Sequence, residues 1–169
     1  MLFAWVVVVA TLWRWGVPAA AQEDNRPPKG FFALFNGKDL SGWHGEQTMN
    51  PEKLAAMPEA ERKKKLAEWN EDMRKHWSVR NGELINDGKG VYLTTDRAFS
   101  DAEFWIDWKI VPGGDSGVYL RATPQVQIWD PDARPQNAVG SGGLYNNKIH
   151  RSTPLVRADN PVGQWNRFR

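Results

Sequence analysis

The chain has 169 residues, a length typical of one domain, and it carries a formal charge of +2 with no cysteine. The near-neutral charge argues against a nucleic-acid-binding protein, which usually needs a clustered basic face. The absence of cysteine excludes disulfides, thiolate metal sites and a thiol nucleophile. The 10 Trp, 7 Phe and 3 Tyr are a heavy aromatic load, and such rings serve both in cores and as stacking platforms.

An apolar run opens the chain. Residues 2–13 read LFAWVVVVATLW and precede Arg14, with small residues at Ala19 and Ala21. This pattern predicts a signal peptide over residues 1–21, and therefore a secreted or periplasmic protein. A membrane span needs about 20 apolar residues, so we expect no stable span after cleavage, although retention as an anchor stays open. Residues 22–29 are polar and predict a linker, which leaves 30–169 as the domain.

The domain is expected to begin with a strand at residues 31–35, FFALF, because an apolar segment precedes an Asn-Gly turn signal. We interpret the following NGKDLSGW, and the SGWHG phrase that holds His44, as a loop. Asn50 before Pro51, and Pro58 before a charged run, predict helix starts within an insertion at about 51–76. Leu66, Trp69 and Met73 follow helical spacing and predict its buried stripe.

From Trp77 onward the pattern predicts strands. WSVRNGELIND contains an Asn-Gly hairpin signal at Asn81. AEFWIDWKI alternates, so that Phe104 and Trp108 share one face and Trp105 and Asp107 the other. SGVYLRA and QVQIWD predict a further strand pair. Many short strands with close turns predict an antiparallel β-sandwich with one helical insertion.

The strand pair predicts an unusual face. If the aliphatic residues of SGVYLRA and QVQIWD face the core, alternation places a polar and aromatic set opposite them: Tyr119, Arg121, Gln125, Gln127 and Trp129. Planar hydrogen-bonding groups and rings suit a sugar, whose C–H side stacks on indole. An ordinary exposed sheet face with cross-strand pairs is the alternative. In that case Arg121 would pair with a carboxylate such as Asp107.

Several phrases, in order, resemble a known family. FFALFNGKDLSGWHG, WSVRNGELIND, GDSGVYLR, PQVQIWD, GGLYNN and VGQWNRFR are similar to the 3-keto-disaccharide hydrolase domain family, common in exported bacterial proteins. The resemblance implies a concanavalin A-like jelly roll with a sugar site on its concave sheet. It also implies cleavage of glycosides that carry a ketone at C3. Family members continue with further strands, so we expect this chain to be incomplete at its C-terminus.

The chemistry of a 3-keto sugar differs from ordinary glycoside hydrolysis. Most glycosidases need two carboxylates, whereas Gln125 and Gln127 cannot titrate, and family members frequently have Glu where this chain has Gln125. A ketone acidifies the C2 proton, so one base and one group that stabilises the ketone oxygen suffice. Arg121 is the candidate for the group that stabilises the ketone oxygen. The candidate bases are Asp130, Tyr145, His150 and Asp115; Asp130 could instead cap the turn before Pro131, and Asp115 could be a turn residue.

Two functions follow from these residues. One is a hydrolase, or lyase-hydratase, that cleaves 3-keto-glycosides with Arg121, Asp130, Tyr145 and His150 as catalytic candidates. The other is a non-catalytic carbohydrate-binding module. Both use a substrate-binding set of Tyr119, Gln125, Gln127, Trp129 and His44. No cofactor is predicted, the scattered histidines mark no metal site, and an oxygen-ligated divalent metal and the oligomeric state stay open.

Overall fold

The computed structural model describes residues 26–169 except 121–123, 146, 148 and 151. The predicted signal, residues 1–21, therefore lies outside the described residues. The elements in chain order are β1 (Trp43–Glu46), α1 (Pro51–Ala55), α2 (Glu59–His76), β2 (Trp77–Arg80), β3 (Glu83–Asn86), β4 (Tyr92–Thr95), β5 (Ile106–Trp108), β6 (Asp115–Tyr119), β7 (Gln125–Trp129), the 3-10 helix η1 (Pro135–Val139), β8 (Leu144–Tyr145) and β9 (Asn166–Phe168).

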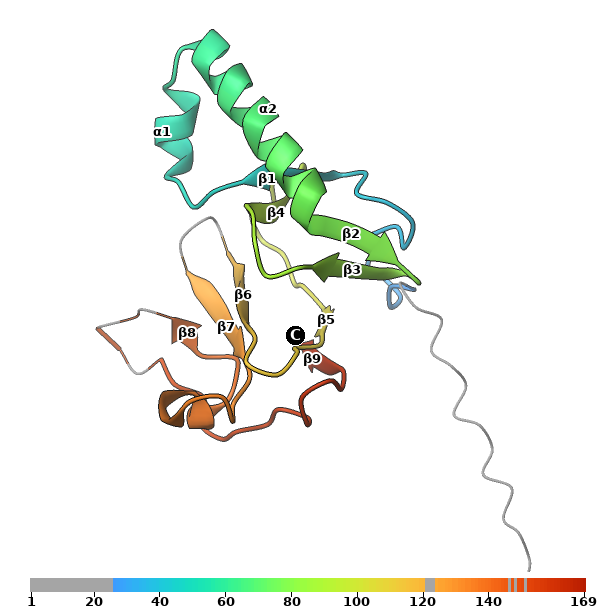
Figure 1. The fold of residues 1–169 in the computed structure, drawn as a ribbon, viewed down its shortest axis with the longest axis vertical. Helices are drawn as coiled ribbons and strands as arrows, with labels where there is room; N and C mark the ends of the chain where they lie inside the picture. Colours follow the sequence, from blue (N-terminus) through green and yellow to red (C-terminus); the bar gives the residue numbers. More distant parts are fainter. Residues whose placement is uncertain (1–25, 121–123, 146, 148, 151) are drawn as a thin grey trace, which may run out of the picture.

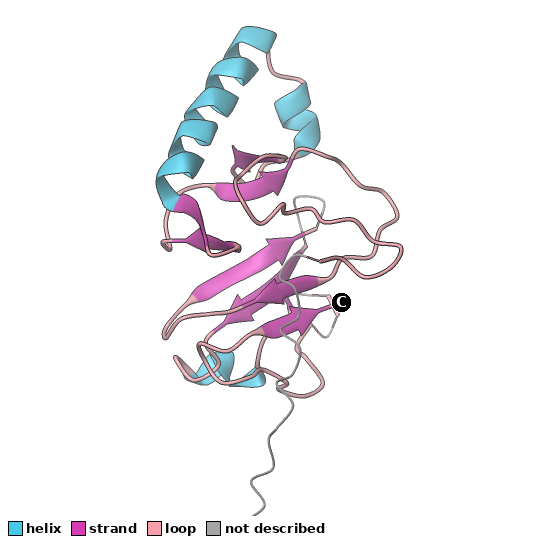
Figure 2. Ribbon diagram, turned by 90° about the vertical axis from the view of Figure 1, so that its right-hand side faces the viewer, coloured by secondary structure: helices cyan, strands magenta, loops and turns pink. Residues whose placement is uncertain are grey.

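The architecture is mainly β, and its described strands form four small antiparallel sheets: β1–β4, β2–β3, β5–β9 and β6–β7–β8 (Figures 1 and 2). None of these sheets, as far as the described residues show, closes into a barrel, which agrees with a β-sandwich. The two α-helices lie at one end of the molecule, and the three-stranded sheet lies at the other end together with η1 (Figure 1). No helix in the described ranges has the length and hydropathy to cross a bilayer.

The helices predicted at 51–76 are confirmed. Asn50 caps α1 by accepting a hydrogen bond from the Glu52 amide at 2.8 Å, and Pro51 occupies the first turn, where a missing N–H costs nothing. The stripe is confirmed as well, because Trp69 and Met73 are buried and Leu66 packs against them.

The predicted hairpin at Asn81 is also confirmed. Asn81 and Gly82 both have positive φ, 52° and 77°, which is the conformation that a two-residue turn between twisted strands requires. The strand predicted at residues 31–35 is wrong. These residues form no strand. The Phe31 ring packs against Trp105, and the Phe32 ring packs against Phe99. SGWHG is not a loop throughout either, because β1 begins at Trp43 and includes His44.

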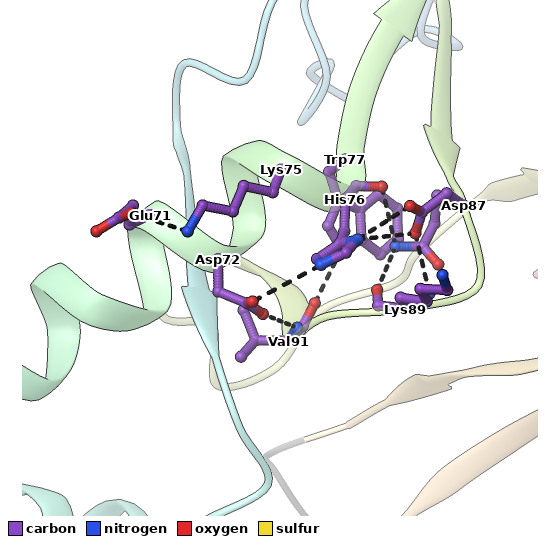
Figure 3. A network of polar contacts seen from close by, with 9 residues as sticks. Glu71, Asp72, Lys75, His76, Trp77, Asp87, Lys89 and Val91 are labelled. Atoms are coloured by element: carbon purple, nitrogen blue, oxygen red, sulfur yellow. Dashed lines mark hydrogen bonds and ion pairs between the residues drawn. The ribbon is translucent and has the colours of Figure 1, made fainter.

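Hydrogen bonds join the C-terminal end of α2 to the loop that leads into β4 (Figure 3). Asp72 Oδ2 accepts a hydrogen bond from the Val91 amide at 2.8 Å, and Trp77 Nε1 donates to the Val91 carbonyl at 2.9 Å. The ring of His76 meets the carboxylate of Asp87 at 2.9 Å. The contacts with Asp72 and Trp77 hold Val91, which belongs to the hydrophobic cluster under α2.

The Asp87 contact makes the stability of this junction pH-dependent. The hydrogen bond from His76 is the main cause that lowers the pKa of Asp87 below its ordinary value of 3.8. A lowered folded-state pKa stabilises the fold above the unfolded value, and this stabilisation is lost as the pH falls through the lower folded value. We therefore expect Asp87→Asn to lower the melting temperature at about pH 5 and to have little effect at about pH 2, measured by circular dichroism.

The matched control for this prediction is Asp101→Asn, since Asp101 is exposed and makes no hydrogen bond to the described residues. It is expected to leave the melting temperature unchanged at both pH values. An Asp87→Asn variant with the same loss at both pH values would contradict a role for the ionised carboxylate.

Candidate functional site

The predicted polar and aromatic face is present on the sheet β6–β7–β8. The register places Tyr119 opposite Gln125, and Gln125 opposite Tyr145, so these three side chains form one row across the sheet. Gly117 lies opposite Gln127, and Asp115 opposite Trp129, on the same face. The strands thus bring together four residues of the predicted binding set and two of the candidate bases.

The carboxylate of Asp115 and the side-chain amides of Gln125 and Gln127 form hydrogen bonds in the middle of this face. Gln127 is 3% exposed, and its Nε2 donates to Asp115 Oδ1 at 2.6 Å and to the Ser116 carbonyl at 3.1 Å. Gln125 lies across Gly117, where a side chain would overlap it, and also donates to the Ser116 carbonyl. Asp115 is therefore a strand residue that holds Gln127, and the turn interpretation of Asp115 is wrong.

A small cavity of about 120 Å³ opens beside this face. Gln127, Trp129 and Tyr145 line it, with residues of the η1–β8 connection and of 152–154. The indole Nε1 of Trp129 donates to the Gly140 carbonyl at 2.9 Å, which fixes the ring, whereas Tyr145 is 52% exposed. A fixed indole beside an accessible phenol suits stacking and hydrogen bonding to a sugar ring.

Neither Asp130 nor His150 lines this cavity. Asp130 is buried, and its two carboxylate oxygens accept backbone amides of Gly113 and Asp132, each at 2.8 Å. Asp130 therefore caps the turn that follows β7. His150 is exposed, and its backbone amide donates to Asn147 Oδ1 at 3.3 Å.

The Tyr119 end of the face meets the sheet β1–β4. The rings of Tyr119 and Tyr92 pack edge to face at 5.1 Å. Burial raises the pKa of the Tyr119 phenol, and its hydrogen bond with Tyr92 raises it further, while one with Thr48 opposes the shift. Tyr119 therefore stays neutral and can act as a hydrogen-bond donor.

His44 lies on β1 between two carboxylates. Its Nδ1 is 2.7 Å from Asp96 Oδ1 and its Nε2 is 3.2 Å from Glu46 Oε2. His44 and Asp96 line an open cleft of about 560 Å³, and Asn70 and Arg74 of α2 form its other wall. This cleft is larger than the cavity beside Trp129. His44 therefore lines this cleft and not the Trp129 cavity.

Arg121, the predicted ketone-binding residue, lies outside the described residues. Its alternative partner, Asp107, is held by another arginine: Arg167 Nη2 donates to Asp107 Oδ2 at 2.7 Å across the β5–β9 pair. The alternation predicted for 103–110 is confirmed, because Ile106 and Trp108 are shielded and Asp107 is exposed.

Sequence reasoning missed Glu46, Tyr92 and Asp96. The spacing of two between His44 and Glu46 was the available signal, because it places both side chains on one face of a strand. Asp96 could not be found, since it is 52 residues from His44. Within the described ranges, no group of three His, Asp or Glu side chains is arranged to hold a metal ion.

Comparison with known proteins gives a consistent result. The chain is similar to a protein of Bacteroides thetaiotaomicron named 3-keto-disaccharide hydrolase, at 23% identity over 163 residues, covering 83% of this chain and 51% of that protein. The chain therefore spans about half the length of this curated relative. No solved structure matches. Residues 30–169 match the family described as 3-keto-alpha-glucoside-1,2-lyase-like domain, and the chain belongs to this family.

Proposed function

We propose that the protein cleaves glycosides and disaccharides whose sugar carries a ketone at C3. The observation that carries the proposal is the row of Tyr119, Gln125 and Tyr145 beside the Trp129 cavity. Such a face suits a ring with hydroxyl groups on its edge and C–H groups on its side. Family membership and the name of the Bacteroides relative support a 3-keto-disaccharide as the substrate.

The proposed reaction is an elimination followed by addition of water. A base takes the acidic C2 proton, the enolate expels the substituent at C1, and water then adds to the double bond. Gln125 and Gln127 favour this route over a two-carboxylate mechanism, because an amide binds hydroxyl groups and does not exchange protons. Arg121 remains the proposed donor to the ketone oxygen, on the ground of its residue type alone.

The decisive experiment compares a 3-keto-disaccharide such as 3-keto-trehalose with trehalose itself. Release of a 3-keto hexose from the first, and none from the second, is the expected result. Binding of either sugar without turnover would instead favour the non-catalytic carbohydrate-binding module. No binding and no turnover would contradict both functions.

Tyr145→Ala tests the binding face. Removing the exposed phenol is expected to raise KM about tenfold and to change kcat less, because stacking is similar in the ground state and the transition state. The matched control is Phe32→Ala, since Phe32 is equally exposed at 54% but packs on Phe99 and Arg97. An unchanged KM in Tyr145→Ala would remove this face from the binding site.

Two further features belong to the proposal. The concanavalin A-like jelly roll is supported by antiparallel pairs that join distant segments, such as β5 with β9. Action outside the cytoplasm is supported by the apolar run and small residues at 2–21. Mass spectrometry of the exported protein should find Gln22 as its first residue.

A further inference from the structure

The segment from His44 to Thr48 borders the proposed sugar face. His44 and Glu46 alternate along β1 and point to one side of it, and Thr48 follows in a bend two residues after the strand ends. Glu46 lies directly opposite Tyr92 in the β1–β4 ladder, and opposite residues share a face. Tyr92 packs on Tyr119, whose hydroxyl also bonds to Thr48. The polar face of β1 therefore continues the face of β6–β7–β8.

Glu46 is the inner end of a chain of hydrogen bonds. Asp96 contacts His44 Nδ1 at 2.7 Å, and His44 Nε2 contacts Glu46 Oε2 at 3.2 Å. The side chains become less accessible along this chain, from 56% exposed for Asp96 to 25% for His44 and 18% for Glu46. Among the described residues, the second carboxylate oxygen of Glu46 has no hydrogen-bond partner. An oriented carboxylate with one free oxygen, linked to solvent through an imidazole, is suited to proton transfer.

The other carboxylates near the face are already engaged. Asp115 holds the amide of Gln127, and both oxygens of Asp130 accept backbone amides. Using either as a base would break a contact that maintains the sheet or its turn. The Glu46 carboxylate, by contrast, contacts the imidazole of His44 and accepts no backbone amide of the described residues.

We propose that Glu46 is the base that removes the C2 proton of the 3-keto sugar, with His44 and Asp96 as positioning residues; this inference rests on the proposed function. The Glu46 carboxylate takes the proton, and the C–H electron pair forms an enolate with the ketone. The enolate then expels the C1 substituent, whose oxygen takes the proton back from Glu46. The products are an alcohol and an enone, and water adds across C1 and C2 to give the 3-keto sugar.

The test follows proton abstraction without cleavage. A 3-keto-1,5-anhydroglucitol has the acidic C2 proton but no exocyclic leaving group at C1, so enzyme in D₂O should exchange that proton without releasing an alcohol, as measured by proton NMR. Glu46→Gln is expected to slow this exchange by about 100-fold or more. The matched control is Glu83→Gln, because Glu83 pairs with Lys109 at 3.3 Å and belongs to the separate sheet β2–β3, so this variant should leave exchange unchanged.

Two further variants separate catalysis from folding. Glu46→Asp keeps the carboxylate and should retain measurable exchange even if Glu46→Gln is poorly folded by circular dichroism. Asp96→Asn should lower kcat for cleavage and change KM little, since it alters only the orientation of His44.

The outcomes distinguish the inference from the proposed function. Wild-type exchange and cleavage with undiminished exchange in Glu46→Gln would overturn the role of Glu46 and leave the function standing. Equal loss of exchange in Glu46→Gln and Glu46→Asp, both folded, would also overturn it in favour of a structural role. A wild type that neither exchanges nor cleaves would overturn both.

Discussion

Trp69→Ala is expected to lower the free energy of unfolding by about 3–5 kcal/mol. Trp69 is 7% exposed and forms the centre of the cluster under α2 with Met73 and Val91. Its removal leaves a cavity that a helix tied down at Asn70 and Asp72 cannot collapse to fill, because both residues hold backbone amides of other segments. Chemical denaturation, monitored by far-ultraviolet circular dichroism, measures the change in the free energy of unfolding.

The matched control is Trp165→Ala. Trp165 is 47% exposed and has Lys109 over its ring at 4.5 Å, so its truncation should cost about 1 kcal/mol or less. Equal losses in the two variants would show that α2 contributes no core to this fold.

Gly45→Ala is expected to lower the free energy of unfolding by about 2–3 kcal/mol. A methyl group at Gly45 would overlap the carbonyl of Trp69 and come within 2.9 Å of Met73 Cβ. The Gly45 amide also donates to Asn70 Oδ1 at 2.9 Å, so the strand cannot move away from α2 without breaking a hydrogen bond. Thermal unfolding of the variant measures the loss.

Ser78→Ala in β2 serves as the control for this prediction, because Ser78 is exposed and its substitution should change stability by about 0.5 kcal/mol or less. A Gly45→Ala variant as stable as the wild type would show that α2 does not lie this close to β1 in solution. The same displacement would disturb His44 and Glu46, the neighbours of Gly45 on β1, so the variant should also lose the cleavage activity that we propose.

The local elements followed from the sequence because their causes are local. Asn50 and Pro51 define a helix start through one side-chain cap, and Asn81 with Gly82 defines a hairpin through positive φ. The stripe of Trp69 and Met73 follows from helical spacing alone. The strand expected at 31–35 failed because pairing needs a partner segment, and its aromatic rings instead pack on Trp105 and Phe99.

The sequence by itself determined which side chains share the face of β6 and β7, because alternation along a strand is a property of the extended backbone. Only the tertiary structure decided what each side chain does there. Gln127 is engaged by Asp115, and Asp130 by two backbone amides, through contacts between separate segments. Asp96 reaches His44 across 52 residues because β4 returns beside β1 after the helices. Such pairings depend on where the chain returns, and no local pattern encodes that position.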